Sequence, residues 1–443
     1  MSLELLLSTL IFLGTYTAIL TNKVERSLAA VAGGTLMVVA GLFLGFYTEK
    51  EVITEAIDWN TIGLLLGMMI VVGILKDTGL FETLAIWAVK LSRGNYFFMI
   101  LLFGFLAAFL STTIDNVTTI LLIAPISMSI SSVLGIDPKP ILLTQGLFSN
   151  IGGVATLVGD PPNIMISGAG GFHYLDYIHN LAPTVAICTV VTVIVFKLIF
   201  SKKSKEENNK IHEEALQNIM ERKATREISD WTLLNKSLLG LGFIIVLFIL
   251  HSVITITPAT VALTGAALVL ILTRPDMDEI LERVEWSTLL FFAGLFVVVH
   301  GVVNTGLLTK IASGVLHLTS GSLLFSALII LFLTALGSGL VDNIPFTAAM
   351  LPIVGTLSAN LTGDSNILWW ALAFGAGFGG NATYIGSSAN VMIVKISEDH
   401  EEPISMKYWL KYGTVITLIT TLIAGTVITI QIITPLDLAF FPS

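Results

Sequence analysis

A set of motifs occurs twice in this chain at one constant spacing of 227 residues, which is the separation of Asp115 from Asp342. Chance similarity between apolar segments would match Leu with Val, but it would not match an Asp-Asn pair at that spacing. The matched positions are Trp59 and Trp286, Gly67 and Gly294, Asp115 and Asp342, Asn116 and Asn343, Pro125 and Pro352, Gly152 and Gly379, and Asn163 and Asn390. The constant spacing therefore predicts two structural repeats within one chain.

The two copies consist mainly of long apolar runs. Apolar residues make up 54% of the chain and charged residues 12%, against about 25% charged residues in a typical soluble domain. A helix needs about 20 apolar residues to cross a bilayer, whereas barrel strands would appear as alternating segments of roughly ten residues. Because the runs are long and continuous, we predict an all-α polytopic membrane protein. A single soluble core has no room for so many of them.

Ten apolar runs are long enough to span the bilayer. The predicted spans are 4–21, 27–46, 59–76, 141–168, 181–200, 236–255, 257–273, 286–303, 368–394 and 409–432. The apolar regions 96–133 and 323–360 each contribute either no crossing or two, because each is either a re-entrant hairpin or a pair of short spans. Segments 80–92 and 307–318 are too short to span, and we expect them to be interfacial helices.

The number of crossings fixes the relative orientation of the two copies. Five spans separate the start of 27–46 from the start of its counterpart 257–273, and the region 96–133 adds none or two. Both totals are odd, so the repeats are predicted to have inverted topology. Inverted repeats with interrupted helices at matched positions are typical of secondary transporters, which hold their solutes near the bilayer midplane.

The segments 152–163 and 379–390 are predicted to be the interruptions. The first reads GGVATLVGDPPN, and its glycines and the Pro161-Pro162 pair break an apolar run. A broken helix exposes backbone N–H and C=O groups, which membrane depth allows only beside protein or a water-filled cavity. The ends of the half-helices carry partial charges that suit an ion. We therefore expect the ligand to approach the backbone at these glycines.

Three aspartates are the strongest candidates for chemistry. A carboxylate at membrane depth costs about 3 kcal/mol and usually faces a binding site or an ion pathway. Asp115 and Asp342 are expected there, with helix capping as the alternative. Asp160 has Ser387 as its counterpart, so it is a candidate for carrying a coupling proton, or else it caps its own turn.

The other candidates are Asn, Thr and Gly positions in the same segments. The predicted substrate- and ion-binding residues are Thr113, Asp115, Asn116, Gly152, Gly153, Thr156, Asn163, Asp342, Asn343, Gly379, Gly380, Asn381, Thr383 and Asn390, with proton coupling at Asp115, Asp160 and Asp342. The single cysteine, Cys188, excludes a disulfide and a multi-thiolate metal site. We predict no resident metal, no cofactor and no enzyme activity, with an intramembrane enzyme as a remote alternative.

Basic residues set the predicted orientation. They gather in loops on one side, and the polar segment 201–231 lies on that side. The positive-inside rule then places that side in the cytoplasm and the N-terminus outside, in the cell (inner) membrane. No basic patch indicates nucleic-acid binding. The predicted division is 1–26 for an N-terminal helix and loop, 27–200 for the first repeat, 201–235 for a cytoplasmic linker, 236–256 for a connecting helix, 257–432 for the second repeat and 433–443 for a tail.

Four segments resemble a known group of transporters. TIDNVTTILLIAPI, NIGGVATLVGDPPNIMIS, VDNIPFTAAMLPI and GGNATYIGSSANVMI are similar to the arsenical-pump membrane protein and P-protein branch of the ion transporter superfamily. That superfamily also holds citrate and sodium–dicarboxylate carriers and some sodium/proton antiporters. The resemblance extends over roughly residues 25–432.

The resemblance implies about eleven transmembrane helices, two re-entrant hairpins and a homodimer, with a cytoplasmic ATPase subunit if the protein is an arsenical pump. The hairpin tips would fall at 113–116 and 339–343. The dicarboxylate carriers have Ser-Asn-Thr at their tips, whereas this chain has Asp115 and Asp342. A desolvated carboxylate at each tip disfavours a dianionic substrate by several kcal/mol.

The resemblance and the tip residues together suggest a function. Arsenite is mostly an uncharged trihydroxide at neutral pH, so oxygen and amide groups suffice to bind it. By family association we expect proton-coupled efflux of arsenite or antimonite. The alternatives are sodium/proton antiport, for which oxygen ligands are suited, and sodium-coupled transport of a carboxylate or another anion. The coupling ion is accordingly H⁺ or Na⁺.

Overall fold

The computed structural model describes residues 2–21, 24–254 and 256–434, and within these ranges every regular element is a helix. The predicted tail, 433–443, lies almost wholly outside them. The first half contains α1 (Leu3–Thr21), α2 (Arg26–Leu44), α3 (Glu49–Thr54), α4 (Trp59–Lys76), α5 (Leu80–Ser92), α6 (Tyr96–Ser111), α7 (Asn116–Leu134), α8 (Lys139–Gly153), α9 (Pro161–Gly170), α10 (Tyr174–Asn180) and α11 (Ala182–Asn208). The short α12 (Glu213–Glu221) and the 3-10 helix η1 (Ala224–Glu227) follow.

The second half repeats the same series of long elements. It contains α13 (Trp231–Ile254), α14 (Pro258–Thr273), α15 (Met277–Glu282), α16 (Trp286–Asn304), α17 (Leu307–Leu318), α18 (Leu323–Leu340), α19 (Asn343–Asn360), α20 (Ile367–Gly379), α21 (Ser388–Asp399) and α22 (Met406–Ile433). Eight helical segments of the described chain are long and apolar enough to cross a membrane. The chain is therefore an all-α, multi-pass membrane protein, as the sequence predicts.

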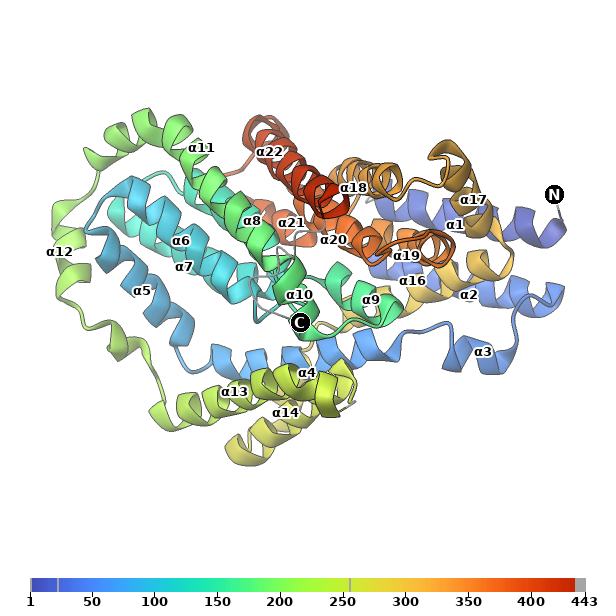
Figure 1. Ribbon diagram of the computed structural model, residues 1–443. Helices are drawn as coiled ribbons and strands as arrows, with labels where there is room; N and C mark the ends of the chain where they lie inside the picture. The colour runs from blue at the N-terminus through green and yellow to red at the C-terminus, as the bar shows by residue number, and fades with distance from the viewer. Residues whose placement is uncertain (1, 22–23, 255, 435–443) are drawn as a thin grey trace.

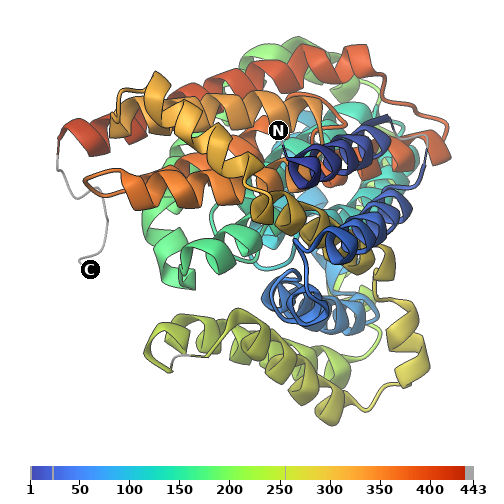
Figure 2. The same cartoon turned by 90° about the vertical axis from the view of Figure 1, so that its right-hand side faces the viewer.

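The repeat extends beyond the motifs that reveal it. α1 lies 227 positions before the region of α13, and both pack on the helix that follows them, α2 and α14. The two halves also interlock, because α2 packs along α16 while α14 packs along α4. Figures 1 and 2 both place α13 and α14 beside α4. Each repeat is thus completed by a helix of the other.

Two matched glycines allow these helices to cross closely. A Cβ at Gly67 would lie 2.6 Å from the backbone carbon of Ala262 on α14. A Cβ at Gly294 would lie 2.5 Å from the backbone carbon of Ala30 on α2. Both separations are shorter than a carbon–carbon contact allows. The crossings therefore require glycine, which explains the Gly67 and Gly294 match in the sequence.

α6–α7 and α18–α19 are helical hairpins. The first turns at residues 112–115, and its open end is tied by a 2.6 Å hydrogen bond from the Tyr96 hydroxyl to the Asp137 carbonyl. The second turns at residues 341–342. Both tips end inside the protein, where Asp115 and Asp342 are buried. The regions 96–133 and 323–360 are accordingly re-entrant hairpins.

Two of the predicted spans are broken helices. The run 141–168 contains α8 and α9 with residues 154–160 between them, and 368–394 contains α20 and α21 with 380–387 between them. α6 packs along α8, and α18 packs along α20 in the same way. Each hairpin therefore lies against the broken helix of its own repeat.

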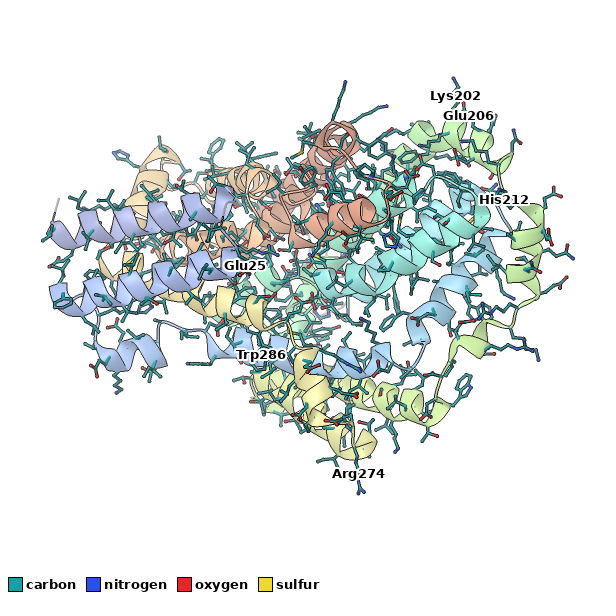
Figure 3. All side chains as sticks on the ribbon, turned by 180° about the vertical axis from the view of Figure 1, so that it is seen from behind. Glu25, Lys202, Glu206, His212, Arg274 and Trp286 are labelled. Carbon is teal, nitrogen blue, oxygen red and sulfur yellow. The ribbon has the colours of Figure 1, made fainter. Side chains whose placement is uncertain are left out.

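The polar linker packs against the open end of the first hairpin. α11 continues past the predicted end of its apolar run to Asn208, whose side chain accepts a 2.8 Å hydrogen bond from the backbone N–H of Tyr96. Lys203 forms an ion pair with Asp137 beside the same end. Figure 3 shows Lys202, Glu206 and His212 where α11 leads into α12. The linker thus joins the two repeats and also covers one end of the first.

Candidate functional site

Asp115 and Asp342 cap the inner helix of each hairpin. The carboxylate of Asp115 accepts hydrogen bonds from the Thr118 N–H at 2.9 Å and the Thr118 hydroxyl at 2.6 Å. Asp342 accepts from the Ile344 N–H at 3.1 Å. These carboxylates lie at the positive ends of α7 and α19. The predicted alternative of helix capping therefore holds for both residues, and both are also buried at the tips.

The asparagine after each aspartate reaches the broken helices. The Asn343 amide donates to both carboxylate oxygens of Asp160, at 3.1 and 3.3 Å. The Asn343 backbone N–H donates to the Gly386 carbonyl at 3.1 Å. Asn116 donates instead to the side-chain oxygen of Asn150 at 3.0 Å. The second hairpin is thereby bonded to the breaks of both repeats.

Asp160 and Asn150 explain the asymmetry seen in the sequence. The counterpart of Asp160 is Ser387, whose hydroxyl donates to the Asn150 side-chain oxygen at 3.0 Å. The counterpart of Asn150 is Gly377. The first repeat thus has a carboxylate on its break and an amide on the preceding helix, whereas the second repeat has a short hydroxyl side chain on its break and a glycine on the preceding helix. Asn150 bridges the gap that the shorter Ser387 leaves.

Asn150 also connects the two repeats at the centre. Its amide donates to the side-chain oxygens of Asn381 at 2.8 Å and Asn390 at 3.1 Å. Asn381 donates in turn to the Leu147 carbonyl at 3.2 Å. All three side chains are buried. Buried amides form such chains because an unpaired polar group is costly in a low-dielectric interior.

Asn163 and Asn390 hold the interrupted backbone. The Asn163 amide donates to the carbonyls of Gly153, Val154 and Thr156 at 2.8 to 3.2 Å. The Asn390 amide donates to the carbonyls of Gly380 and Thr383 at 2.8 and 3.3 Å. These bonds satisfy carbonyls that the break leaves without helical partners. The two asparagines therefore use their donors for the structure of the break.

Two threonines tie each break to its hairpin. The Thr156 hydroxyl donates to the Thr112 carbonyl at 2.7 Å, and the Thr383 hydroxyl donates to the Gly339 carbonyl at 2.7 Å. The two bonds are related by the repeat. Thr113 donates to the Leu110 carbonyl at 3.1 Å and so closes the last turn of α6. The hydroxyls of the three predicted threonines thus donate hydrogen bonds to backbone carbonyls at or near the hairpin tips.

The glycines at the breaks lie against backbone. A Cβ at Gly152 would lie 2.4 Å from the Ala108 carbonyl oxygen, and one at Gly379 would lie 2.5 Å from that of Ala335. A Cβ at Gly153 would lie 2.6 Å from the Gly159 carbonyl oxygen, and one at Gly380 would lie 3.0 Å from that of Gly386. The four predicted glycines therefore allow hairpin and break to approach.

Arg26 is a central residue that the sequence does not reveal. Its guanidinium donates to Asp342 at 2.7 Å and to the Ser388 hydroxyl at 2.6 Å. Figure 3 shows the start of α2, marked by Glu25, near the middle of the molecule. The position 227 residues later is Val253, so the repeat gives no signal for Arg26. It was assigned only to a cytoplasmic loop by its charge.

Glu285 is a second residue that sequence reasoning missed. It precedes α16, accepts a 3.0 Å hydrogen bond from the Thr288 hydroxyl and interacts electrostatically with Asp115 and Arg26. Its counterpart Asp58 accepts from Thr61 in the same way. In both copies an acidic residue precedes the matched tryptophan, Trp59 or Trp286, and a threonine follows three residues after the acid. This repeated pattern is the signal that would have identified Glu285.

The centre therefore collects more acidic than basic side chains. Asp160 interacts electrostatically with both Asp115 and Asp342. Among the ion pairs of the described residues, the one from Arg26 to Asp342 is the one that reaches this set. The side-chain oxygen of Asn116 is buried without a hydrogen-bond partner in the described structure. Such a centre suits a proton, a cation or a hydroxyl donor better than an anion.

A cleft leads into the molecule between α4, α9, α16 and α19. Its volume is about 330 Å³, and Glu55, Asp58, Asn60 and His300 line its polar side. Ala348, Leu351 and Pro352 of α19 also line it, so the cleft borders the second hairpin. It offers a solute access between a hairpin and the helices that surround it.

Comparison with known proteins relates this arrangement to transporters. A family model described as a citrate transporter matches residues 16–375. A 46 kDa membrane protein of Mycobacterium leprae is 38% identical over 420 residues, which cover 94% of this chain and 96% of that protein. The human P protein is 32% identical over 488 residues, which cover 93% of this chain and 58% of the P protein.

Two further relatives bear on the fold and on the function. A Mycobacterium tuberculosis protein described as an uncharacterized transporter is 37% identical over 94% of this chain and 96% of its own length. The YdaH transporter of Alcanivorax borkumensis superposes with a TM-score of 0.57 over 98% of this chain and 99% of that chain, at 15% identity. At that identity the likeness to YdaH shows the fold alone.

Proposed function

Because this chain belongs to the citrate transporter family, and is therefore a membrane transporter, we propose that it exports arsenite or antimonite in exchange for protons. In this proposal the solute binds between the two hairpin tips and the two breaks. The protein forms a homodimer in the inner membrane with its N-terminus outside. Each point rests on the chemistry of the central residues and on the resemblance of the motifs.

The contact between Asp160 and Asn343 carries the proposal. Asp160 is 1% exposed, and it joins the break of the first repeat to the tip of the second. A carboxylate in such a position gains or loses a proton at a point that both repeats contact. Proton relays in membrane proteins use buried acids of this kind. Protonation of Asp160 would then be coupled to the contact between the repeats.

The caps on α7 and α19 argue against an anionic solute at the tips. Helix N-termini are ready anion sites when their N–H groups are free. Here Asp115 and Asp342 already accept those N–H groups. A citrate trianion would meet two carboxylates where it needs donors. An uncharged trihydroxide instead donates to carboxylates and to the free oxygen of Asn116.

Sodium/proton exchange is the second candidate, and the unpartnered oxygen of Asn116 favours it. That oxygen is buried, and Na⁺ prefers carboxylate, carbonyl and amide oxygens. Asp115 lies next to it in the chain. A cation bound there would neutralise part of the negative charge of the central aspartates. Competition between Na⁺ and H⁺ for one carboxylate is sufficient for exchange.

Proton-gradient dissipation in everted membrane vesicles tests these candidates. Arsenite, antimonite, Na⁺, Li⁺ and citrate are added separately to vesicles that contain the protein or its Asp160→Asn variant. The proposal predicts a response to arsenite or antimonite that the variant lacks. A response to Na⁺ or Li⁺ alone would make the protein a cation/proton antiporter, and a response to citrate alone would contradict the argument from the caps.

A further inference from the structure

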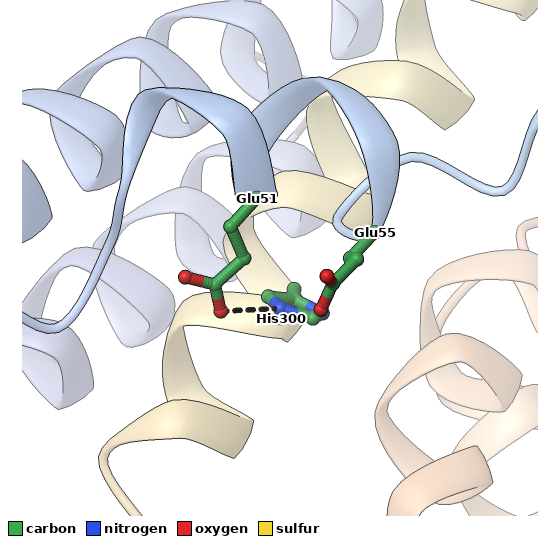
Figure 4. Close-up of side chains that lie close together, drawn as sticks. All are labelled: Glu51, Glu55 and His300. Atoms are coloured by element: carbon green, nitrogen blue, oxygen red, sulfur yellow. Dashed lines mark hydrogen bonds and ion pairs between the residues drawn. The ribbon is translucent and has the colours of Figure 1, made fainter.

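Glu51, Glu55 and His300 form a cluster at the mouth of the cleft, away from the hairpin tips. Each offers one ligand atom, and these atoms lie within 4.8 Å of one another. Figure 4 shows the His300 ring between the two carboxylates. From this geometry we propose that the protein binds one divalent transition-metal ion, of which Zn²⁺ is the probe, through these three side chains.

The spacing of the cluster follows from two elements. Glu51 and Glu55 are four residues apart at α3, so they lie on the same face of one helical turn. His300 belongs to α16 and faces them across the mouth. Its Nε2 is 3.1 Å from Glu51 Oε1. Ligands of a tetrahedral zinc ion are roughly 3.4 Å apart, given bond lengths near 2.1 Å. Glu55 is exposed, so its carboxylate has room to approach the other two ligands.

Neighbouring side chains hold two of the ligands in place. The Asn304 amide donates to Glu51 Oε1 at 2.5 Å, and the Thr48 N–H donates to Glu51 Oε2 at 3.3 Å. The Tyr47 ring stacks on His300 with centroids 5.7 Å apart and an interplanar angle of 13°. Partners that orient the ligands in this way are typical of metal sites. Two of the three ligands, Glu51 and His300, are therefore already oriented without a metal.

The cleft gives this cluster a feature that surface acidic groups lack. Glu55 and His300 both line the cavity of about 330 Å³, together with Asp58 and Asn60. Three protein ligands leave a fourth position on a tetrahedral metal for water or a solute. Because two of the three ligands line the cavity, a solute in the cavity could occupy that position. A bound metal would also tie α3 to α16 at the entrance.

The ligand set selects the class of metal. One imidazole with two carboxylates suits zinc, manganese, cobalt or nickel, whereas Ca²⁺ and Mg²⁺ prefer oxygen ligands alone. On the counterpart surface, Asp278 and Glu282 of the second repeat correspond to the two glutamates, but Gly73 of the first repeat corresponds to the histidine. The site therefore exists once per chain, and the counterpart surface provides a matched control.

The test is calorimetric titration of the purified full-length protein in lipid nanodiscs with ZnCl₂ and, separately, CaCl₂. We expect one Zn²⁺ per chain, with little Ca²⁺ binding. His300→Gln and Glu55→Gln should each weaken Zn²⁺ binding at least about tenfold, and Asn304→Ala by about 10- to 100-fold. Glu282→Gln and His317→Gln should leave the affinity unchanged. Because Glu55 is exposed, its variant is expected to fold normally.

Three results would overturn the site. One is the absence of saturable binding at one ion per chain. Another is unchanged affinity in both His300→Gln and Glu55→Gln. The third is loss of binding in His251→Gln with retention in His300→Gln, which would place the metal at the His173–His251 contact of 3.0 Å. The titration involves no transport, so its outcome is independent of the vesicle experiment.

Discussion

At the scale of single residues, the two capping aspartates have different surroundings. Asp342 pairs with Arg26 and with the Ser388 hydroxyl, at 2.7 and 2.5 Å. Asp115 has Thr118 as its side-chain partner and interacts electrostatically with Glu285. One carboxylate is thus balanced by a cation, and the other lies near a second acid. The two residues are therefore not equivalent in their surroundings.

Asp342→Asn is predicted to destabilise the protein more than Asp115→Asn. The first change leaves the Arg26 guanidinium beside a neutral amide, which costs about 1–3 kcal/mol. The second leaves an amide oxygen that still accepts from Thr118. Thermal unfolding of both purified variants measures the difference. Combining Asp342→Asn with Arg26→Gln should recover part of the loss, and equal melting temperatures for the two single variants would contradict this account.

Asp160→Asn is predicted to abolish proton coupling while leaving the fold intact. The amide has the shape of the carboxylate and still faces Asn343, but it neither gains nor loses a proton near neutral pH. The proton-gradient response should therefore fall to that of vesicles without the protein. Asp176→Asn serves as the control, because Asp176 caps α10. A full response from Asp160→Asn would rule out Asp160 as the proton carrier.

The repeat identified central residues that have counterparts, but sequence reasoning missed Glu285, whose counterpart is Asp58, and two residues that have no such counterpart. Asp115, Asn163, Thr156 and their partners in the second copy all lie at the tips or breaks. Arg26 and Asn150 were missed, because Val253 and Gly377 stand at the matched positions. A residue without a matching counterpart gives no signal in a comparison of the two copies.

At the scale of elements, each hairpin and its broken helix form one closely packed unit. The two units are built alike, since Gly152 and Gly379 touch the hairpin backbone and Thr156 and Thr383 bond its carbonyls. The sequence predicted the breaks because Gly-Gly and Pro-Pro interrupt an apolar run. The sequence did not decide whether 96–133 and 323–360 are hairpins, because apolar composition alone does not distinguish a hairpin from two short spans.

Gly152→Ala is predicted to destabilise the protein by about 1–3 kcal/mol, because its Cβ would overlap the Ala108 carbonyl oxygen. Gly379→Ala should do the same in the second unit. Gly14→Ala is the matched control, since Gly14 lies in α1 with no atom within 4 Å of an added Cβ. Alanine there should be neutral or stabilising by up to about 1 kcal/mol. Thermal unfolding in detergent compares the three, and equal stabilities would show that the packing adapts.

At the scale of the whole molecule, the helices α1 and α13 take part in the repeat. The sequence division placed them outside it, since no polar or glycine motif of α1 recurs 227 residues later in α13. Their packing on α2 and α14 assigns them to corresponding places. Apolar helices give no motif to match, so this correspondence appears only in three dimensions. The division into two repeats was otherwise visible from the constant spacing.

The inverted topology predicts that Lys202 and Lys310 lie on opposite sides of the membrane. Three spans, α13, α14 and α16, separate them, and neither hairpin lies between. Both side chains are exposed, and Cys188 is the single native thiol. In a Cys188→Ala background, Lys310→Cys should react with an impermeant maleimide on intact cells. Lys202→Cys should react only after permeabilisation, and labelling of both on intact cells would refute the topology.

The mismatches between Asp160 and Ser387 and between Asn150 and Gly377 have an energetic consequence. If the two halves were identical, the inward- and outward-facing states would be related by a two-fold rotation and equally populated without a gradient. An unmatched carboxylate and an unmatched amide at the contact between the repeats remove that degeneracy. A difference of 1.4 kcal/mol already makes one state about tenfold more populated. Divergence of the two copies thus sets the ratio of inward- to outward-facing protein in the absence of a gradient. Ion and solute gradients then drive net transport from that unequal distribution.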